Sequence, residues 1–417
     1  MFFKNIHLKE WQQFEKIEID FHDRVTILTG ANGSGKTTLL NILAKHFNWE
    51  LDSLATPKQD RKSGIVKFVS RLFNGEDKSN ENVIGTIGYS NGTAGNLQIS
   101  GGNAAQYQIQ ITNKQNIKCF YIPSHRPIYR YQAVGNIPTT KKNKQTAFQE
   151  VSNSYRERYF GGNSQPISFF MKNTLIGWMI QGYGVHKANQ KTIMPADAEQ
   201  IRYFEGFQEV LKKILPASLN FNEIEIRNME VVFVCNDGKD EFILETASGG
   251  ISALLDMAWQ IYMYSTKENG DFTVLIDEVE NHLHPTMQRQ VLQDLVKAFP
   301  SARFIVSTHS PLVVNSVKDS NIYALKYNEK SKIDAHKLDF KNKARTAAEI
   351  LDEVLGVSFT MPMWAEEHLK QIVSKYAVQK ELNSDTLGAL RQELALIGLE
   401  KLMPSAIHSL VEDKAND

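Results

Sequence analysis

Two short segments of alternating apolar and polar residues open the chain, FKNIHLKEW at 3–11 and FEKIEIDF at 14–21. Alternation with a period of two predicts strands that bury one face. Val25, Ile27 and Leu28 then predict a buried strand, which a glycine-rich turn and the helix-like run TTLLNILAKHF follow. This order of strand, loop and helix is typical of a phosphate-binding βα unit.

Polar and turn-forming residues dominate much of the chain between 51 and 165. Residues 51–116 are rich in Gly, Asn, Ser and Thr and include the alternating run QYQIQIT, which predicts hairpins and loops. A strand-like segment, CFYIP, ends at Pro123. The stretch 132–165 is polar again and carries KKNK at 141–144, so we expect an exposed, flexible loop there.

Helical spacing returns between 166 and 216, in ISFFMKNTLIGWMI and AEQIRYFEGFQEVLKKIL, and predicts a helical subdomain inserted into an α/β framework. The strand-like segments EIEI, EVVFVC and EFIL follow. Residues 250–340 run helix, strand, helix, strand, strand, which is the alternation expected of a parallel sheet with crossover helices. The last 70 residues look helical, without a heptad run long enough for a coiled coil.

Composition excludes several functional classes. The 417 residues include 47 basic and 47 acidic side chains, a balance that excludes an all-over basic nucleic-acid coat and an acidic solvating tail. A hydrophobic content of 42% argues against global disorder. The chain contains no run of about 18 apolar residues, so no membrane span is predicted. With only two cysteines, Cys119 and Cys235, we expect a reducing cytoplasm.

The turn after the first buried strand, GANGSGKT at 30–37, fits the pattern GxxxxGK[ST]. Glycines let a chain curl tightly enough to point several backbone N–H groups at phosphates. Lys36 would neutralise the β and γ phosphates, the Thr37 hydroxyl would hold Mg²⁺, and the following helix would add its dipole. The predicted nucleotide-binding set is Gly30, Asn32, Gly33, Ser34, Gly35, Lys36, Thr37 and Thr38.

A second buried strand, FTVLI at 272–276, runs directly into Asp277 and Glu278. Adjacent side chains on a strand point to opposite sides, so the two carboxylates cannot have the same role. Asp277 fits a ligand of Mg²⁺, directly or through water. Glu278, at the carboxyl end of the strand, is placed to orient or deprotonate an attacking water.

Two further segments complete the candidate chemistry. His309 ends the strand-like run RFIVST and could hydrogen-bond a γ phosphate or the attacking water. A lone histidine is usually structural, so its position one strand after the Asp-Glu pair is what points to a function. Ser248, Gly249 and Gly250 precede the helix-like run ISALLDMAWQIYMY, where small residues at a helix N-terminus can present N–H groups and a hydroxyl to an anion.

These motifs, with DEVENHLHP at 277–285 and STHSP at 307–311, resemble the ABC type of P-loop ATPase. Within it they resemble the OLD/RecF/Rad50-like branch of stand-alone ATPases, as in anti-phage systems such as Septu and in toxin–antitoxin systems. The resemblance covers 1–50 and 240–320. It implies an α/β ATPase head with a mixed β-sheet, made of residues 1–125 and 221–340, with an inserted helical subdomain at 126–220 and a helical tail at 341–417.

The resemblance also implies how the site works. Ser248, Gly249 and Gly250 would be the signature motif, which closes the ATP site of a second copy in a head-to-tail dimer. Thr37 and Asp277 would hold Mg²⁺, and Glu278 and His309 would act in hydrolysis. Ser124 and His125 stand where such ATPases usually place a glutamine at the end of a central strand, and Ala247 replaces the leucine that usually begins the signature.

We therefore predict an ATP-hydrolysing, Mg²⁺-dependent ATPase of a prokaryotic anti-phage system, acting as a homodimer on a separate effector such as a nuclease or toxin. Fewer than 100 residues follow the last predicted strand, and they read as helices, so we expect the effector to be a separate protein.

Two other functions stay open. One is a RecF-like DNA-binding ATPase of DNA repair, because basic residues are interleaved with Tyr129 and Tyr131 in a pattern that suits nucleic-acid contact. The basic residues concerned are Arg126, Arg130, Lys141, Lys142 and Lys144. The other is a nucleotide-binding subunit of a transporter, which the 212 residues between Lys36 and Ser248 and the missing glutamine disfavour.

Overall fold

A computed structural model describes most of the chain, namely residues 1–59, 66–69, 83–100, 105–136, 138, 140–187, 191–339, 350, 363–377, 384–400, 403 and 407. The chain divides into two compact units, Met1–Ile350 and Leu351–Asp417. Each unit has a hydrophobic cluster of its own. Within the described residues, no helix is both long and apolar enough to cross a membrane.

The strands at the centre of the first unit run parallel. They are β10 (Cys119–Ile122), β16 (Phe272–Ile276), β17 (Ala302–Thr308), β3 (Val25–Gly30) and β18 (Asn321–Tyr327). The strands β10, β16 and β3 are buried along their whole length, as continuous apolar runs dictate when helices cover both faces of a sheet. The alternation of strands and helices over 250–340 therefore does build a parallel sheet.

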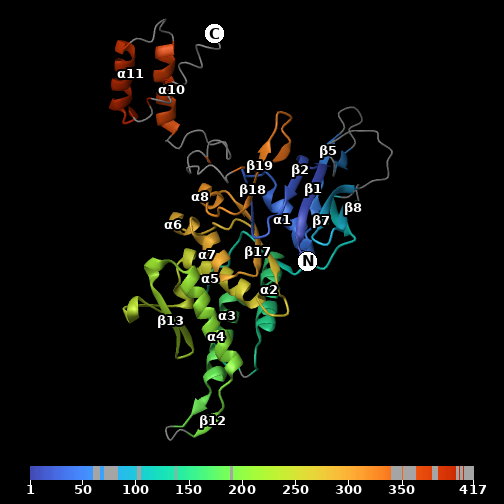
Figure 1. Cartoon of the computed structure of the whole chain (residues 1–417), viewed down its shortest axis with the longest axis vertical. Coiled ribbons are helices and arrows are strands. Elements are labelled where there is room, and N and C mark those ends of the chain that lie inside the picture. Colours follow the sequence, from blue (N-terminus) through green and yellow to red (C-terminus); the bar gives the residue numbers. More distant parts are fainter. Residues whose placement is uncertain are drawn as a thin grey trace. The chain divides into compact units, whose positions relative to one another are not determined.

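Mostly antiparallel strands extend this sheet on one side. They are β19 (Ile333–Leu338), β2 (Phe14–Asp20), β1 (Phe3–Trp11), β7 (Val83–Tyr89), β8 (Ala94–Ser100), β9 (Gln106–Thr112) and β4 (Ser53–Leu54). Within the described residues the sheet has twelve strands, in the order β10-β16-β17-β3-β18-β19-β2-β1-β7-β8-β9-β4. Figure 1 labels β17, β18, β19, β2, β1, β7 and β8 of this sheet. The predicted α/β class with a mixed β-sheet is confirmed.

Helices and short strands complete the first unit. The helices are α1 (Lys36–Ala44), α2 (Lys144–Tyr159), α3 (Ile167–Tyr183), α4 (Ala198–Ile214), α5 (Gly249–Tyr264), α6 (Pro285–Gln288), α7 (Val291–Ala298) and α8 (Pro311–Val314). The short hairpins are β5 (Thr56–Gln59) with β6 (Val66–Val69) and β11 (Val185–His186) with β12 (Thr192–Met194). A separate three-stranded sheet consists of β13 (Phe221–Arg227), β14 (Glu230–Cys235) and β15 (Asp240–Ile243).

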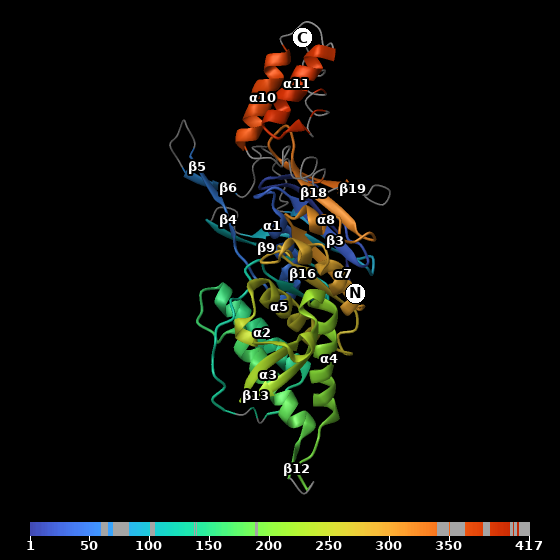
Figure 2. The same cartoon turned by 90° about the vertical axis from the view of Figure 1, so that its left-hand side faces the viewer.

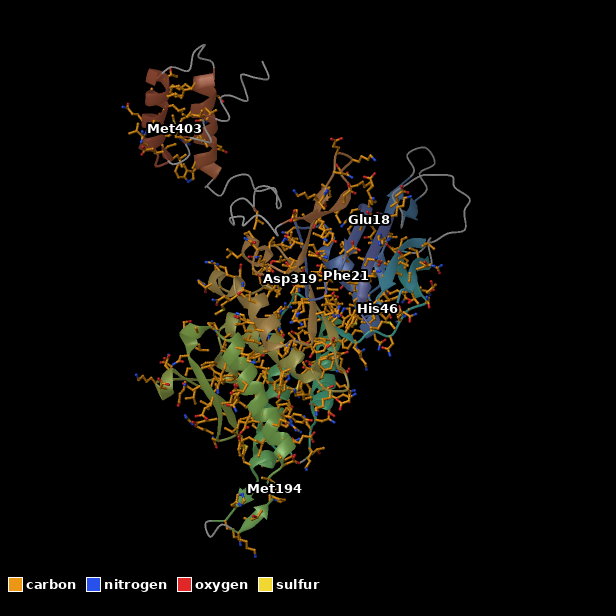
Figure 3. All side chains as sticks on the ribbon, in the orientation of Figure 1. Glu18, Phe21, His46, Met194, Asp319 and Met403 are labelled. Carbon is orange, nitrogen blue, oxygen red and sulfur yellow. The ribbon has the colours of Figure 1, made fainter. Side chains whose placement is uncertain are left out.

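The inserted helices pack on one another and on α5. Helix α4 contacts α3, α5 and α7, and α2 contacts α3 and α5, so these helices gather on one side of the unit (Figure 2). The hairpin of β11 and β12 joins α3 to α4, and Met194 marks it at the far end of these helices (Figure 3). The insertion meets the sheet through Phe148 of α2, which packs on Phe120 of β10, and through α5, whose Tyr264 also packs on Phe120.

The expectation of an exposed, flexible loop over 132–165 is wrong for its second half. Residues 144–159 form α2, and the N-cap Asn143 accepts a hydrogen bond from a backbone N–H of its first turn. One face of α2 buries Phe148 and Val151 against its neighbours. The sequence of this segment looks polar because the residues on the exposed face of α2 outnumber the buried apolar ones.

The second unit contains two described helices, α10 (Met363–Ala377) and α11 (Ser384–Leu396). Leu369, Ile372, Leu390 and Leu394 belong to the cluster between them, and a Lys375–Glu393 ion pair joins their surfaces. Much of the predicted tail at 341–417, including 341–349 and 351–362, lies outside the described residues.

Candidate functional site

The candidate site lies where neighbouring parallel strands end. Strand β17 lies between β16 and β3, and β10 flanks β16. The phosphate loop (residues 30–37) follows β3, Asp277 and Glu278 follow β16, and His309 follows β17. Because the carboxyl ends of parallel strands meet at one edge, segments up to 280 residues apart in sequence converge there.

The phosphate loop has the curl that its glycines predict. Gly33 and Gly35 have φ values of 77° and 86°, in the left-handed region. At Gly35 a Cβ would lie 2.3 Å from Cζ of Phe14, so a side chain there would clash as well as strain the backbone. Gln13 braces the loop by donating from Nε2 to the Gly33 carbonyl at 2.9 Å. Helix α1 starts directly after the loop, at Lys36.

Lys36 points back into the loop rather than into solvent. Its side chain is buried, and Nζ donates to the carbonyls of Gly30 and Ala31, both at 3.0 Å. Burial lowers the pKa of Lys36 to about 8, although the carboxylates of Asp277 and Glu278 act in the opposite direction. The loop therefore holds a partly desolvated cation that an incoming phosphate would stabilise.

The Asp277 carboxylate, at the end of β16, joins this strand to β17 and to helix α1. It is 1% exposed, and its Oδ2 accepts from the Thr37 hydroxyl at 2.9 Å while Oδ1 accepts from the Ser307 hydroxyl at 2.5 Å. A hydroxyl and a carboxylate are hard oxygen ligands of the kind Mg²⁺ prefers beside phosphates. Within the described residues, no group of three or more His, Cys, Asp and Glu could hold a metal without such a phosphate.

Glu278 turns away from Asp277. Its φ of 46° is unusual for a residue with a side chain, and its backbone N–H donates to the Ser307 hydroxyl at 2.8 Å. The carboxylate is partly exposed, with Oε1 3.8 Å from Nε2 of His309 and Oε2 3.4 Å from the Asn281 amide. The two adjacent acids thus occupy different environments, one buried and one facing the open edge.

His309 stands between Lys36 and Glu278. Its Nδ1 is 3.5 Å from Nζ of Lys36, and its backbone N–H donates to Glu280. Burial, together with the Lys36 ammonium, lowers the pKa of His309 below its usual range. The imidazole is therefore neutral at pH 7 and can exchange hydrogen bonds with a phosphate or a water.

Arg126 requires a correction, because the structure removes it from the predicted nucleic-acid surface. Its side chain is 6% exposed. The guanidinium donates to the carbonyls of Pro123, Asp277 and Glu278, the last two at 3.0 and 3.3 Å. Arg126 thus stabilises the backbone of Asp277 and Glu278 from the buried side of the site.

Most of the remaining basic residues of the predicted patch are also engaged. Lys141 pairs with Asp197, and Lys142 pairs with Glu150 at 2.8 Å. Lys144 is half-buried, with Nζ 3.3 Å from the centroid of the Tyr262 ring, and burial lowers its pKa to about 7. Arg130 is exposed. Lys141 is exposed as well, so nucleic-acid contact by Arg130 and Lys141 stays a prediction.

Ser124 and His125 lie just after the end of β10, beside the acidic pair. The Ser124 carbonyl accepts from the Asn281 amide at 2.8 Å, and the Ser124 hydroxyl is 3.3 Å from Nδ1 of His125. Both side chains are at least partly exposed. Their role as the counterpart of the usual glutamine stays a prediction.

Ser248 precedes the first residue of α5 and is exposed. Although it is the N-cap, its side chain makes no capping hydrogen bond to the helix. A Cβ on Gly249 would meet nothing within 4 Å, whereas one on Gly250 would lie 3.1 Å from the His282 carbonyl. The start of α5 therefore presents a hydroxyl that does not cap the helix and backbone N–H groups that have no partner within the helix, while Gly250 packs closely against the His282 carbonyl.

Sequence reasoning assigned no role to several residues that shape this site. Ser307 bonds both acids, and Glu280 holds the backbone of His309. Ser307 lies in the motif STHSP and Glu280 in DEVENHLHP, so the sequence marks both residues but does not show which groups they bond. Asn281 belongs to the same motif as Glu280, whereas Gln13 carries no local signal.

Two family models and a named relative match this chain. The family model described as "AAA domain, putative AbiEii toxin, Type IV TA system" matches residues 25–315, and a model described as "P-loop containing region of AAA domain" matches residues 3–45. The retron Vc95 probable ATPase of Vibrio cholerae serotype O1 biovar El Tor is 24% identical over 76% of this chain and 72% of its own length.

Two further similarities are shorter or looser. Septu protein PtuA of Bacillus thuringiensis is 26% identical over 37% of this chain and 42% of its own length. The SMC head domain from Thermotoga maritima matches in structure over 81% of this chain and 100% of that domain, with a TM-score of 0.42 and 14% identity.

Nucleotide binding should take up protons near pH 8. The phosphates of bound MgADP will raise the pKa of Lys36 from about 8, so about half a proton per site should be taken up at pH 8 and far less at pH 6.5 from this group. Calorimetric titration with MgADP in buffers of different ionisation enthalpy measures the uptake. A binding enthalpy at pH 8 that does not depend on the buffer would contradict the environment described for Lys36.

Proposed function

This chain belongs to the family described as "AAA domain, putative AbiEii toxin, Type IV TA system", and on that premise we propose that it hydrolyses ATP between two copies of itself, as the ATPase of an anti-phage system. The chain is a P-loop ATPase, so nucleotide binding follows from its family. The convergence of Lys36, Asp277 and Glu278 at one sheet edge is the observation that carries the proposed chemistry.

The residues around Asp277 fit a magnesium nucleotide. The Thr37 hydroxyl and the Asp277 carboxylate would hold Mg²⁺, which would neutralise phosphate charge when bound. Lys36 would exchange its two loop carbonyls for phosphate oxygens. The N–H groups of residues 32–38, at the start of α1, complete the phosphate contacts.

Glu278 and His309 are placed for the hydrolytic step. Glu278 has a partly exposed carboxylate at the open edge, where it would orient a water and accept its proton. Neutral His309, held by Glu280, would donate a hydrogen bond where negative charge develops. Arg126 and Ser307 keep the backbone of Glu278 in its unusual conformation, so the carboxylate is positioned before substrate arrives.

The start of α5 supports a composite site. The Ser248 hydroxyl makes no capping hydrogen bond, and a Cβ on Gly249 would meet nothing within 4 Å. A helix N-terminus of this kind attracts an anion, and the γ phosphate of a second copy is the anion that the family resemblance predicts for it. Closure of two such sites needs a twofold, head-to-tail dimer.

The defence role is supported by the named relatives. The similarity to a retron ATPase extends over three quarters of the chain, and the similarity to Septu PtuA covers a shorter part. We propose that ATP-dependent closure of the dimer controls a separate effector protein, such as a nuclease or toxin. The alternative of a DNA-repair ATPase has lost its main support, because the residues predicted to contact nucleic acid are largely buried or paired.

Replacing Glu278 with Gln should trap an ATP-bound dimer. The amide keeps the size of the side chain but cannot accept a proton, so turnover should fall about 100-fold or more while ATP stays bound. Sedimentation with and without MgATP measures the dimer. A variant that stays monomeric in MgATP and keeps wild-type turnover would contradict the assignment.

Two inactive variants should restore each other's activity. Lys36→Ala destroys the phosphate loop, and Ser248→Arg blocks the signature, yet a mixed dimer holds one site with both parts intact. An equal mixture should regain about a quarter of wild-type turnover, since half of the dimers are mixed and each has one of two sites. If the mixture has only the summed activity of its components, the site is not shared between copies.

Protection against phage should depend on the ATP site. In cells carrying the native locus with its neighbouring genes, Lys36→Ala should reduce plaque protection to the level of an empty vector, because the phosphate loop loses its cation. Lys375→Met is a matched control, since it removes an exposed ion pair in the second unit. Full protection by the Lys36→Ala locus would refute a role for ATP.

A further inference from the structure

A lysine of the insertion is completely buried at the base of the signature segment. The side chain of Lys172, in α3, is 0% exposed. Its Nζ binds the carboxylates of Glu230 and Glu245, the latter at 3.0 Å, and donates to the Gln132 carbonyl at 3.2 Å. A buried ammonium needs such partners because it has lost its hydration shell.

Glu245 connects this lysine to the start of α5. It belongs to a single 3-10 turn, Leu244–Thr246, that lies between β15 and Ser248. Its side chain is 2% exposed, and Lys172 is the cation that holds it. The turn and the helix are linked directly, because the Ala247 carbonyl accepts from the Ser252 hydroxyl at 3.1 Å. The position of Glu245 therefore sets where Ser248 stands.

The other contacts of Lys172 extend to the segment that follows Arg126. Besides the Gln132 carbonyl, α3 holds the Arg130 carbonyl, which accepts from Ser168 at 3.4 Å. Tyr131 covers the cluster: its ring centroid is 4.8 Å from Nζ of Lys172, and its hydroxyl donates to Glu230 at 3.1 Å. Lys172 thus joins the segment that follows Arg126 to the segment that leads into the signature.

We propose that Lys172 is a positioning residue for the signature, so that the insertion determines whether Ser248 can close the ATP site of a second copy. The inference rests on the proposed function. Two carboxylates converge on one ammonium, so loss of the cation leaves uncompensated buried charge and drives the Glu245 turn toward solvent. Lys172 lies outside the phosphate loop and the acidic pair, so its own chain's nucleotide contacts remain.

The test uses the full chain with Glu278→Gln as background, in which ATP should trap the dimer. Adding Lys172→Met should weaken ATP-dependent dimerisation at least about tenfold, since small displacements of a positioned group cost factors of this size. The affinity of the single chain for MgATP should change less than about threefold. Sedimentation in MgATP and equilibrium binding of labelled MgATP to dilute protein measure the two quantities.

Matched variants separate positioning from folding. Glu245→Gln weakens the same link but leaves the Lys172–Glu230 pair, so it should fold normally and still impair dimerisation. Lys172→Arg keeps a cation able to bind both carboxylates, so this variant should retain ATP-dependent dimerisation. Lys142→Met removes another ion pair of the insertion, at 2.8 Å from Glu150, and should have no effect.

The outcomes distinguish this inference from the function on which it rests. If Glu278→Gln forms the ATP dimer and addition of Lys172→Met or Glu245→Gln leaves it unchanged, the inference is overturned and the proposed function stands. Loss of ATP affinity together with dimerisation also overturns it, because Lys172 would then support the whole head. If Glu278→Gln alone forms no dimer, the proposed function fails and the inference falls with it.

Discussion

The buried carboxylate of Asp277 is the interaction on which the rest of the site depends. It accepts from Thr37 at the start of α1 and from Ser307 in β17, and it stands at the end of β16. One acid thereby fixes the relative positions of the three elements that carry the phosphate loop, the acidic pair and His309. The buried negative charge of Asp277 raises the pKa of Lys36 against the effect of burial, and Mg²⁺ would be a second cation beside it in the proposed site.

A second constraint acts on Glu278, whose backbone adopts a costly left-handed conformation. Arg126 holds its carbonyl from one side and Ser307 holds its N–H from the other. Such bracing keeps the carboxylate that we propose as catalytic at a fixed place, which would lower the reorganisation needed during reaction. The buried hydrogen bonds of Arg126 and Ser307 therefore position Glu278, just as the sequence motifs position the phosphate loop.

The local patterns of the chain predict its local structure well. Alternation gave the strands β1 and β2, apolar runs gave β3 and β16, and the glycines of residues 30–37 gave the loop. The edge on which the functional residues meet also follows from sequence, since parallel strands end together. These features depend on neighbouring residues, which is what a sequence displays.

Features that depend on distant partners could not be predicted. Arg126 looked like a surface residue because two of its three acceptors lie 151 and 152 residues away. The apolar stripe of α2 is likewise recognisable only against its neighbours, such as α5. Lys172 reads as an ordinary helix lysine until Glu230 and Glu245 are brought to it. Charged residues are ambiguous in sequence, because burial beside a partner and exposure to water look the same.

The central claim is that the ATP site is completed by a second copy of the chain. The structure of the Glu278→Gln variant with bound MgATP tests this most directly. We predict that the Ser248 hydroxyl of one copy lies within hydrogen-bond distance of the γ phosphate held by Lys36 of the other. A γ phosphate enclosed only by residues of its own chain would contradict the account.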